Sequence, residues 1–350
     1  MGKASHGNFF EDFAIGQEIV HAVPRTITQG DVALYSALYG MRFALQSSDA
    51  FAQACSLPRA PIDNLLLFHV IFGKTVPDVS LNAVANLGYA ECRFLEPAWP
   101  GDSFTARSTV IGLRENANGK TGIVYVRSMG FNQRGDAVLT FVRWVMVNKR
   151  DAAAPAPEVV VPLTDAQVNG EALALPPGLD FSTYDAAVAG SAYRFEDYAV
   201  GERIDHIDGM TIEEAEHQIA TRLYQNTAKG HFDAVLQKAG RFGRRIVYGG
   251  HVISLARSLS FNGLANGCLV AAINGGRHVN AAAGGDTIYC WSEILAKQDF
   301  PERHDIGALR VRTIATKDLA CDTFPSPGGE AEASVLLDLD YWLLMPRSVS

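Results

Sequence analysis

The chain has no long hydrophobic run. Its longest apolar stretches, such as residues 64–73 (NLLLFHVIFG), are far shorter than the roughly 20 apolar residues that cross a bilayer. The start, MGKASHGNFF, lacks the apolar core of a secretion signal, and His6 stands where a myristoylation site needs Ser or Thr. We therefore expect a cytoplasmic protein without a membrane partner.

Cysteine is scarce, and no motif is typical of a metal site. The five cysteines form an odd set without a CxxC spacing, which argues against a disulfide framework and a thiolate zinc site. The nine histidines contain no HExxH motif. We expect no metal, and we expect buried, reduced thiols at Cys55, Cys92, Cys268, Cys290 and Cys321.

An excess of positive charge is also missing. The 30 Lys and Arg residues face 38 Asp and Glu residues, so the formal net charge is −8. A nucleic-acid partner usually requires a basic domain or stripe, and we expect none here. A local basic cluster could still bind a small anionic ligand.

The chain does contain an internal repeat. FEDFAIGQEI begins at Phe10 and FEDYAVGERI at Phe195, and six of these ten positions are identical at an offset of 185 residues. The same offset places Thr26 on Thr211 and Tyr39 on Tyr224. Because 350 residues also exceed the roughly 250 to 300 of a single core, we expect a tandem duplication.

The repeat sets the expected domain boundaries. Residues 151–180 hold five prolines and little periodicity, which is typical of an extended linker on the surface. We expect an N-terminal domain at 1–150, a linker at 151–190 and a C-terminal domain at 191–350. The Pro- and Gly-rich segment at 317–333 predicts a longer loop in the second copy.

Each copy predicts an α+β domain. The segment TIEE at 211–214 has the spacing of a capping box for a helix through Leu223, and residues 248–264 predict a mostly buried helix that ends at an Asn-Gly pair. Alternating residues at 121–131 and 308–316 predict antiparallel strands. We therefore expect two modules, each an antiparallel sheet wrapped around a central helix.

Residues 225–233 (QNTAKGHFD) resemble the hydratase motif GDxNPxH, often followed by xD, of the MaoC-type (R)-specific enoyl-CoA hydratase family. His231 and Asp233 match this motif, whereas Asn226 replaces its aspartate. In the first copy, Met41 and Gln46 stand at the acid and base positions. The resemblance implies a tandem double hot-dog fold with a vestigial site in the first copy and a catalytic second copy.

The FEDYxVGE entry and the GRRIVYGGH stretch resemble one subgroup of that family, the mesaconyl-CoA hydratases. This resemblance implies a hydro-lyase that reversibly interconverts β-methylmalyl-CoA and mesaconyl-CoA (2-methylfumaryl-CoA) plus water. It also implies an acyl-CoA thioester substrate, no cofactor other than the CoA of the substrate, and a homo-oligomer.

The family assigns acid/base work to His231, and a neutral imidazole can take a proton from water and later return it. An amide is no general base, so we expect Asn226 to hold water or substrate. The family's helix-start glycine matches Gly249, whose amide N–H would stabilise enolate charge on the thioester oxygen. Asn64 stands at this position in the first copy.

The same segment supplies candidate substrate-binding residues. Guanidinium groups bind carboxylates and phosphates in pairs of hydrogen bonds, so Arg241, Arg244 and Arg245 could bind a substrate carboxylate or the CoA phosphates. Tyr248 and His251 are expected to line the pocket. Each of these positions has a plainer interpretation: a capping histidine, a turn asparagine, a turn before a buried helix, or a solvated charge run.

Two other functions remain open from the sequence. A hot-dog thioesterase would need an acid on the central helix, and residues 248–264 contain neither Asp nor Glu. A non-catalytic acyl-thioester binding module would fit the repeat and the glycine helix start equally well.

Overall fold

The computed structural model describes residues 3–348. Within them, strands from both halves of the chain form one antiparallel sheet of eleven strands. The strand order is β1-β3-β4-β5-β2-β8-β11-β10-β9-β6, with the short β7 paired to β9. The first half contributes β1 (Glu18–Thr26), β2 (Ala83–Phe94), β3 (Ser103–Glu115), β4 (Thr121–Phe131) and β5 (Ala137–Asn148). The second half contributes β6 (Arg203–Asp205), β7 (Met210–Thr211), β8 (Leu269–His278), β9 (Thr287–Phe300), β10 (Arg303–Lys317) and β11 (Val335–Pro346).

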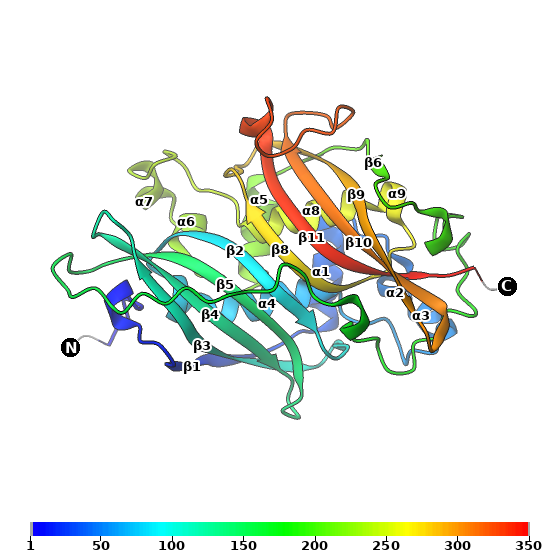
Figure 1. Cartoon of the computed structure of the whole chain (residues 1–350), viewed down its shortest axis with the longest axis horizontal. Helices are drawn as coiled ribbons and strands as arrows, with labels where there is room; N and C mark the ends of the chain where they lie inside the picture. The colour runs from blue at the N-terminus through cyan, green and yellow to red at the C-terminus, as the bar shows by residue number, and fades with distance from the viewer. Residues whose placement is uncertain (1–2, 349–350) are drawn as a thin grey trace.

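The strand order is symmetric about the β2–β8 pair: the first-half strands follow one another outward from this pair in the same order as their second-half counterparts. The two halves join where β2 pairs with β8, in a register that sets Tyr89 opposite Gly276 (Figure 1). The tandem hot-dog expectation is therefore confirmed, with the two sheets fused edge to edge into one.

The helices lie behind the sheet in the view of Figure 1. They are α1 (Gln29–Tyr39), α2 (Ala44–Ser47), α3 (Asp49–Ala54), α4 (Asn64–Thr75), α5 (Glu214–Leu223), α6 (Lys229–Phe232), α7 (Ala234–Lys238), α8 (Gly249–Leu259) and α9 (Phe261–Leu264). The central helices are α4 and α8, and each is almost entirely buried. A helix that is apolar around its whole circumference needs such a position, which explains the sequence of α4.

Equivalent residues of the two copies make equivalent contacts. His21 bonds Ser108 through its Nε2 at 2.7 Å, and His206 bonds Ser292 in the same way at 2.8 Å. The phenol oxygens of Tyr39 and its counterpart lie 2.7 Å apart. The register read from the sequence is therefore also the register of the fold.

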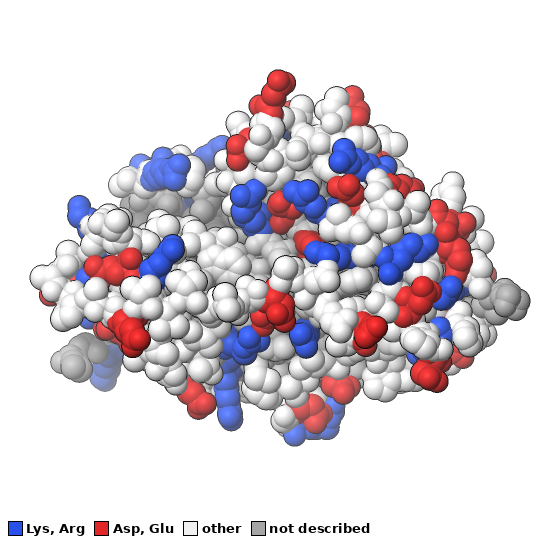
Figure 2. Space-filling model, viewed as in Figure 1, with Lys and Arg blue, Asp and Glu red and all other residues white. Residues whose placement is uncertain are grey.

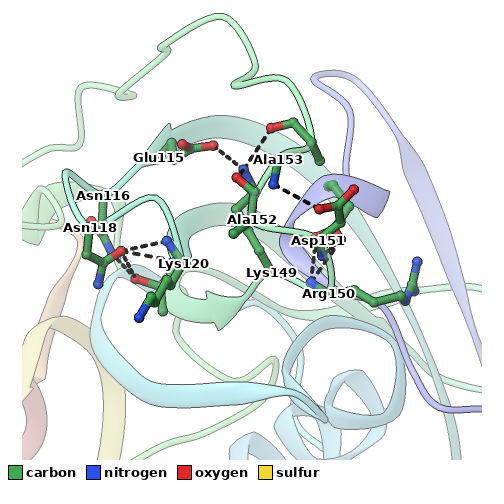
Figure 3. Close-up of polar contacts among 12 residues, drawn as sticks. Glu115, Asn116, Asn118, Lys120, Lys149, Arg150, Asp151, Ala152 and Ala153 are labelled. Carbon is green, nitrogen blue, oxygen red and sulfur yellow. Dashed lines mark hydrogen bonds and ion pairs between the residues drawn. The ribbon is translucent and has the colours of Figure 1, made fainter.

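The segment that connects the halves is anchored where it leaves β5. The Lys149 ammonium binds the Glu115 carboxylate at 2.9 Å and the Ala154 carbonyl at 2.8 Å (Figure 3). Farther on, the Val168 carbonyl accepts a hydrogen bond from the Trp342 indole, and Val168 is buried. The expected surface linker is thus extended, but its apolar side chains pack on the sheet and close a second core cluster.

Three smaller expectations are confirmed, for the cysteines, for the β10–β11 loop and for the end of the central helix. All five cysteines are free and buried. The loop between β10 and β11 is long, and Gly263 interrupts the helix after α8 with a φ of 116°. None of the helices in the described part of the chain is long and apolar enough to cross a membrane. Figure 2 shows acidic and basic side chains interspersed over the sheet face, where pairs such as Arg312 and Asp338 lie 2.8 Å apart.

The capping box at residues 211–214 is wrong. Helix α5 begins at Glu214 without a side-chain cap, because Thr211 belongs to β7 and its hydroxyl lies 2.9 Å from that of Thr287. A capping box does form in the first copy, between Thr28 and Asp31 at the start of α1. The repeat register aligns Thr211 with Thr26, which is also a strand residue, and Thr28 with Glu213, so the second copy has no hydroxyl at the cap position.

Candidate active site

The N-terminus of α8 is an uncapped helix end. Its N-cap residue, Tyr248, makes no side-chain capping hydrogen bond. Within residues 3–348, the amides of Gly249 and Gly250 donate to no side chain and to no carbonyl outside the helix. As the first two helical residues they have no partner inside the helix either. Two N–H groups and the positive end of the helix dipole are therefore available to an oxyanion.

Neither Gly249 nor Gly250 could carry a side chain, because aromatic rings lie where the Cβ atom would be. A Cβ at Gly249 would lie 2.3 Å from the ring of His278, and one at Gly250 would lie 2.6 Å from the ring of His69. A residue without a Cβ at a helix start also lets a ligand come close to the backbone, and the structure adds a different reason. Here the space of the missing side chains is filled by His278 of β8 at Gly249, and by the Tyr248 ring together with His69 of α4 at Gly250.

His231 lies on α6, beside this helix end. Its Nδ1 is 2.9 Å from the carbonyl oxygen of Ile246, so Nδ1 carries the proton and Nε2 keeps its lone pair. The ring lies 5.8 Å from that of Tyr248, centre to centre. Burial lowers the pKa of His231 to about 4, which leaves the imidazole neutral at pH 7. Within residues 3–348 the Nε2 of His231 has no hydrogen-bond partner, so its lone pair is available to a ligand or to water.

Asn226 lies in the turn between α5 and α6. Its side chain is buried, and its Oδ1 accepts a hydrogen bond from the Ala228 amide at 3.1 Å. Gln225, just before it, has a φ of 54°, and this left-handed residue turns the chain away from α5. The side-chain oxygen thus holds the turn, and the Asn226 amide group is the end that can contact water or a ligand.

Five of the nine histidines gather around this helix end. Burial lowers the pKa of His69 and His251 to about 3 and that of His278 to about 4, and it also lowers the pKa of His217. Each is therefore neutral at pH 7, as is His231. A cluster of neutral imidazoles offers both donors and lone pairs without adding charge beside the helix dipole.

The three arginines have different surroundings. Arg245 forms an ion pair with Glu214 at 2.6 Å, and the Nε2 of His217 lies 3.1 Å from the same carboxylate oxygen. Arg244 is exposed and its guanidinium is 4.0 Å from Asp286. Arg241 stacks on Phe242, 5.3 Å from the ring centre, and forms no ion pair within the described residues. Of the three, Arg245 is the one already bound to an acid.

Tyr248 and His251 belong to the buried wall of the site. The Tyr248 phenol is 3.3 Å from Nδ1 of His69, and Nδ1 of His251 is 2.8 Å from the phenol of Tyr39. Among the described residues, the buried Nε2 of His251 has no hydrogen-bond partner. Both residues are thus held by side chains of the first half.

Sequence reasoning missed three residues of this site: His278, Tyr89 and His69. The first two are joined by a hydrogen bond of 3.0 Å across the β2–β8 junction. A histidine that ends an apolar strand beside Gly275 and Gly276 was the available signal. The partner could not be found, because only the pairing of the two halves brings residue 89 to residue 278.

The corresponding region of the first copy lacks this arrangement. The Gln46 amide, at the position of His231, donates to the Cys268 carbonyl at 2.7 Å. A partly open pocket lies at the start of α4, lined by apolar residues together with Asn64 and Glu96. Met41 packs against the main core. Within residues 3–348, no three His, Cys, Asp or Glu side chains are placed to hold a metal ion.

Comparison with known proteins gives the same picture along the whole chain. A protein of Chloroflexus aurantiacus named beta-methylmalyl-CoA dehydratase is 62% identical over 347 residues, which cover 99% of each chain. A protein of Cereibacter sphaeroides named mesaconyl-CoA hydratase is 57% identical over 347 residues, covering 99% of this chain and 100% of the relative.

Solved structures agree. A crystal structure from Chloroflexus aurantiacus, described as a putative MaoC domain protein dehydratase, matches all of both chains with a TM-score of 0.97 and 62% identity. A Mycobacterium tuberculosis protein described as a double hotdog fold covers 97% of this chain and 99% of its own, with a TM-score of 0.75 at 24% identity, which shows the fold. The family model of mesaconyl-CoA hydratase matches residues 2–330. The chain belongs to the mesaconyl-CoA hydratase family.

Proposed function

We propose that this chain is a hydro-lyase that reversibly adds water to the double bond of mesaconyl-CoA to give β-methylmalyl-CoA. The observation that carries the proposal is the free Nε2 of a neutral His231 beside an uncapped helix end. The two full-length relatives whose names contain these substrates support the same reaction.

In this reaction His231 acts as general base and then as general acid. Its Nε2 takes a proton from the water that attacks the β-carbon, and the resulting imidazolium returns this proton to the α-carbon. The Ile246 carbonyl holds the Nδ1 proton throughout and fixes the ring. One positioned acid/base group contributes a rate factor of about 10² to 10⁴.

The start of α8 polarises the thioester. Attack of water at the β-carbon moves electron density onto the thioester oxygen, and the Gly249 amide donates a hydrogen bond to it. Because this charge is larger in the transition state than in the substrate, the interaction accelerates the reaction rather than only binding the substrate. Asn226 orients the attacking water or the substrate through its amide group.

The basic segment before α8 binds the anionic parts of the substrate. Arg241 and Arg244 are exposed and are the candidates for the free carboxylate or the CoA phosphates. Arg245 acts indirectly, since its ion pair with Glu214 ties this segment to α5. In this proposal the C-terminal copy, residues 191–350, performs the chemistry and residues 1–150 support it.

No cofactor takes part in this proposal, and CoA is a portion of the substrate. The homo-oligomeric state and the cytoplasmic location remain predictions from the sequence.

A panel of mesaconyl-, fumaryl- and crotonyl-CoA tests the proposal. Loss of the enoyl-thioester absorbance without release of free thiol is the expected result, fastest with mesaconyl-CoA. Release of free CoA instead of hydration would indicate a thioesterase. Binding without any turnover would indicate a non-catalytic module, and either outcome contradicts the proposal.

A further inference from the structure

The second half contains an imidazole that the reaction described so far does not use. His278 is the last residue of β8, and its ring fills the space in front of the Gly249 Cα, where a Cβ would lie 2.3 to 2.6 Å from three ring atoms. It is therefore packed against the helix end whose amide faces the thioester. Within residues 3–348 its Nε2 has one hydrogen-bond partner, the phenol of Tyr89 at 3.0 Å.

The strand register explains how this pair forms across the two halves. Tyr89 on β2 lies opposite Gly276 on β8, so its side chain shares a sheet face with that of His278, two residues farther along. A Cβ at Gly276 would lie 2.9 Å from the Tyr89 ring, so this glycine makes room for the phenol. On the other side, Arg143 of β5 lies opposite Tyr89.

The hydrogen bond sets the tautomer of His278. Burial raises the pKa of Tyr89 far above its usual value, so the phenol keeps its proton. A buried hydroxyl needs an acceptor, and the Nε2 of His278 is the acceptor within its reach in the described chain. The proton of the neutral imidazole then resides on Nδ1, which makes no hydrogen bond to any of residues 3–348.

We propose that His278 donates a second hydrogen bond, from Nδ1, to the thioester oxygen beside the Gly249 amide, and that Tyr89 of the first half positions it. This inference rests on the hydratase function proposed above. It completes a two-donor oxyanion site from backbone and side chain, and it makes the first half a contributor to the chemistry rather than a scaffold.

The charge state suits this role. A neutral imidazole at the positive end of a helix donates a hydrogen bond without becoming an acid, as in enzymes where a helix start keeps a catalytic histidine neutral. His278 gives up no proton in the reaction. The proton of water still passes through His231 to the α-carbon, so the proton balance is unchanged.

The replacement of His278 by Ala tests the inference kinetically. Loss of one oxyanion donor reduces kcat by about 10²- to 10³-fold, and we expect this loss with KM changed less than about threefold. The matched control is His206→Ala, which removes a buried, neutral histidine from the other end of α8 and leaves kcat unchanged. A kcat for H278A within twofold of the wild type overturns the proposal.

Tyr89→Phe tests the positioning role. It keeps the ring, which packs edge-on against Phe68 at 5.5 Å, and removes the hydrogen bond. We expect kcat to fall by about three- to tenfold, and we expect no further loss when the change is added to H278A, because both act on one donor. Full additivity of the two changes contradicts positioning through His278.

A binding measurement separates this inference from the proposed function. The saturated thioester 2-methylsuccinyl-CoA, labelled with ¹³C at its carbonyl, cannot be hydrated, and its C=O stretching band reports polarisation in the bound state. The band is expected at lower frequency in the wild type than in H278A, with Y89F between them. An identical band in wild type and H278A rejects the role of His278, whereas a wild type that hydrates no enoyl-CoA rejects the proposed function.

Discussion

The two central helices differ most at their first residues. At α4, the Asp63 carboxylate accepts a hydrogen bond from the Leu65 amide at 2.8 Å and so caps the helix. The Asn64 side chain donates to the Val270 carbonyl at 2.8 Å. At α8, two glycines follow an uncapped Tyr248. One helix end is capped by its own acid, and the other has no side-chain cap among the described residues.

The two helix starts thus differ although the two copies share one fold. The capping carboxylate occupies the place that an oxyanion would take, and it supplies the negative charge that the helix dipole favours. Burial raises the pKa of Asp63, while the nearby Arg257 opposes the rise. The first copy thus has a capped helix at the position where, in the proposed reaction, the second copy binds the thioester oxygen.

The largest expected difference between the two copies is at the position of the general base, which is His231 in the second copy and Gln46 in the first. His231→Ala is expected to reduce kcat by ~10²- to 10⁴-fold, because no other group can take the proton from water at that position. Initial rates of mesaconyl-CoA hydration measure the effect. The counterpart Gln46→Ala in the first copy is the matched control and is expected to keep wild-type kcat. A comparable loss in both variants would mean that both copies take part in proton transfer.

An alanine substitution at the first residue of each central helix, α8 and α4, compares the two helix starts. Gly249→Ala places a Cβ in the ring of His278 and is expected to reduce kcat by about 10²-fold through displacement of that donor. Asn64→Ala is the counterpart and costs about 1 kcal/mol of stability through its lost hydrogen bond, with kcat unchanged. Steady-state kinetics and thermal unfolding of both variants measure this, and an active G249A variant contradicts the assigned helix end.

Acid should destabilise the fold through its buried histidines. Because burial lowers the folded pKa of His69, His206 and His251 to about 3 or 4, the unfolded chain binds more protons below pH 6.5. Stability is therefore complete above pH 6.5 and falls as the pH drops to about 4, by on the order of 3 kcal/mol for each such histidine.

Urea unfolding from pH 8 to pH 4 measures this loss. The His206→Ala variant should show a smaller dependence on pH than the wild type, because it has lost one buried histidine whose pKa is lowered. A free energy of unfolding that stays constant between pH 6.5 and pH 4.5 would contradict the neutral state of these groups.

The smallest expected effect concerns the closed helix end. Asp63→Ala removes the cap of α4 and should cost about 1 kcal/mol of stability, without a change in kcat. Thermal unfolding and hydration rates measured on the same samples test both parts. A drop in kcat comparable to that of G249A would show that α4 also serves the reaction.

The repeat predicted much of the fold, because an offset of 185 residues fixes which contacts recur. The histidine–serine bonds of His21 and His206 follow that offset. The capping box at Thr211 failed because a local motif cannot report that a strand claims the same residue. Three-residue spacing is visible in a sequence, whereas competition from tertiary pairing is not.

The candidate site was predictable in part. A family motif pointed to His231 and Asn226, and a glycine pair pointed to the start of α8. Tyr89 and His278 could not be found, because 189 residues separate them and only the fusion of the two sheets brings them within 3.0 Å. Contacts between the copies are the part of the site that neither copy's sequence contains alone.

The most direct measurement is a crystal structure with bound 2-methylsuccinyl-CoA. We expect the thioester oxygen about 3 Å from the Gly249 amide, with the β-carbon facing Nε2 of His231. A thioester bound at the start of α4, beside Asn64, or one whose oxygen meets neither the Gly249 amide nor His278, would contradict the proposed function.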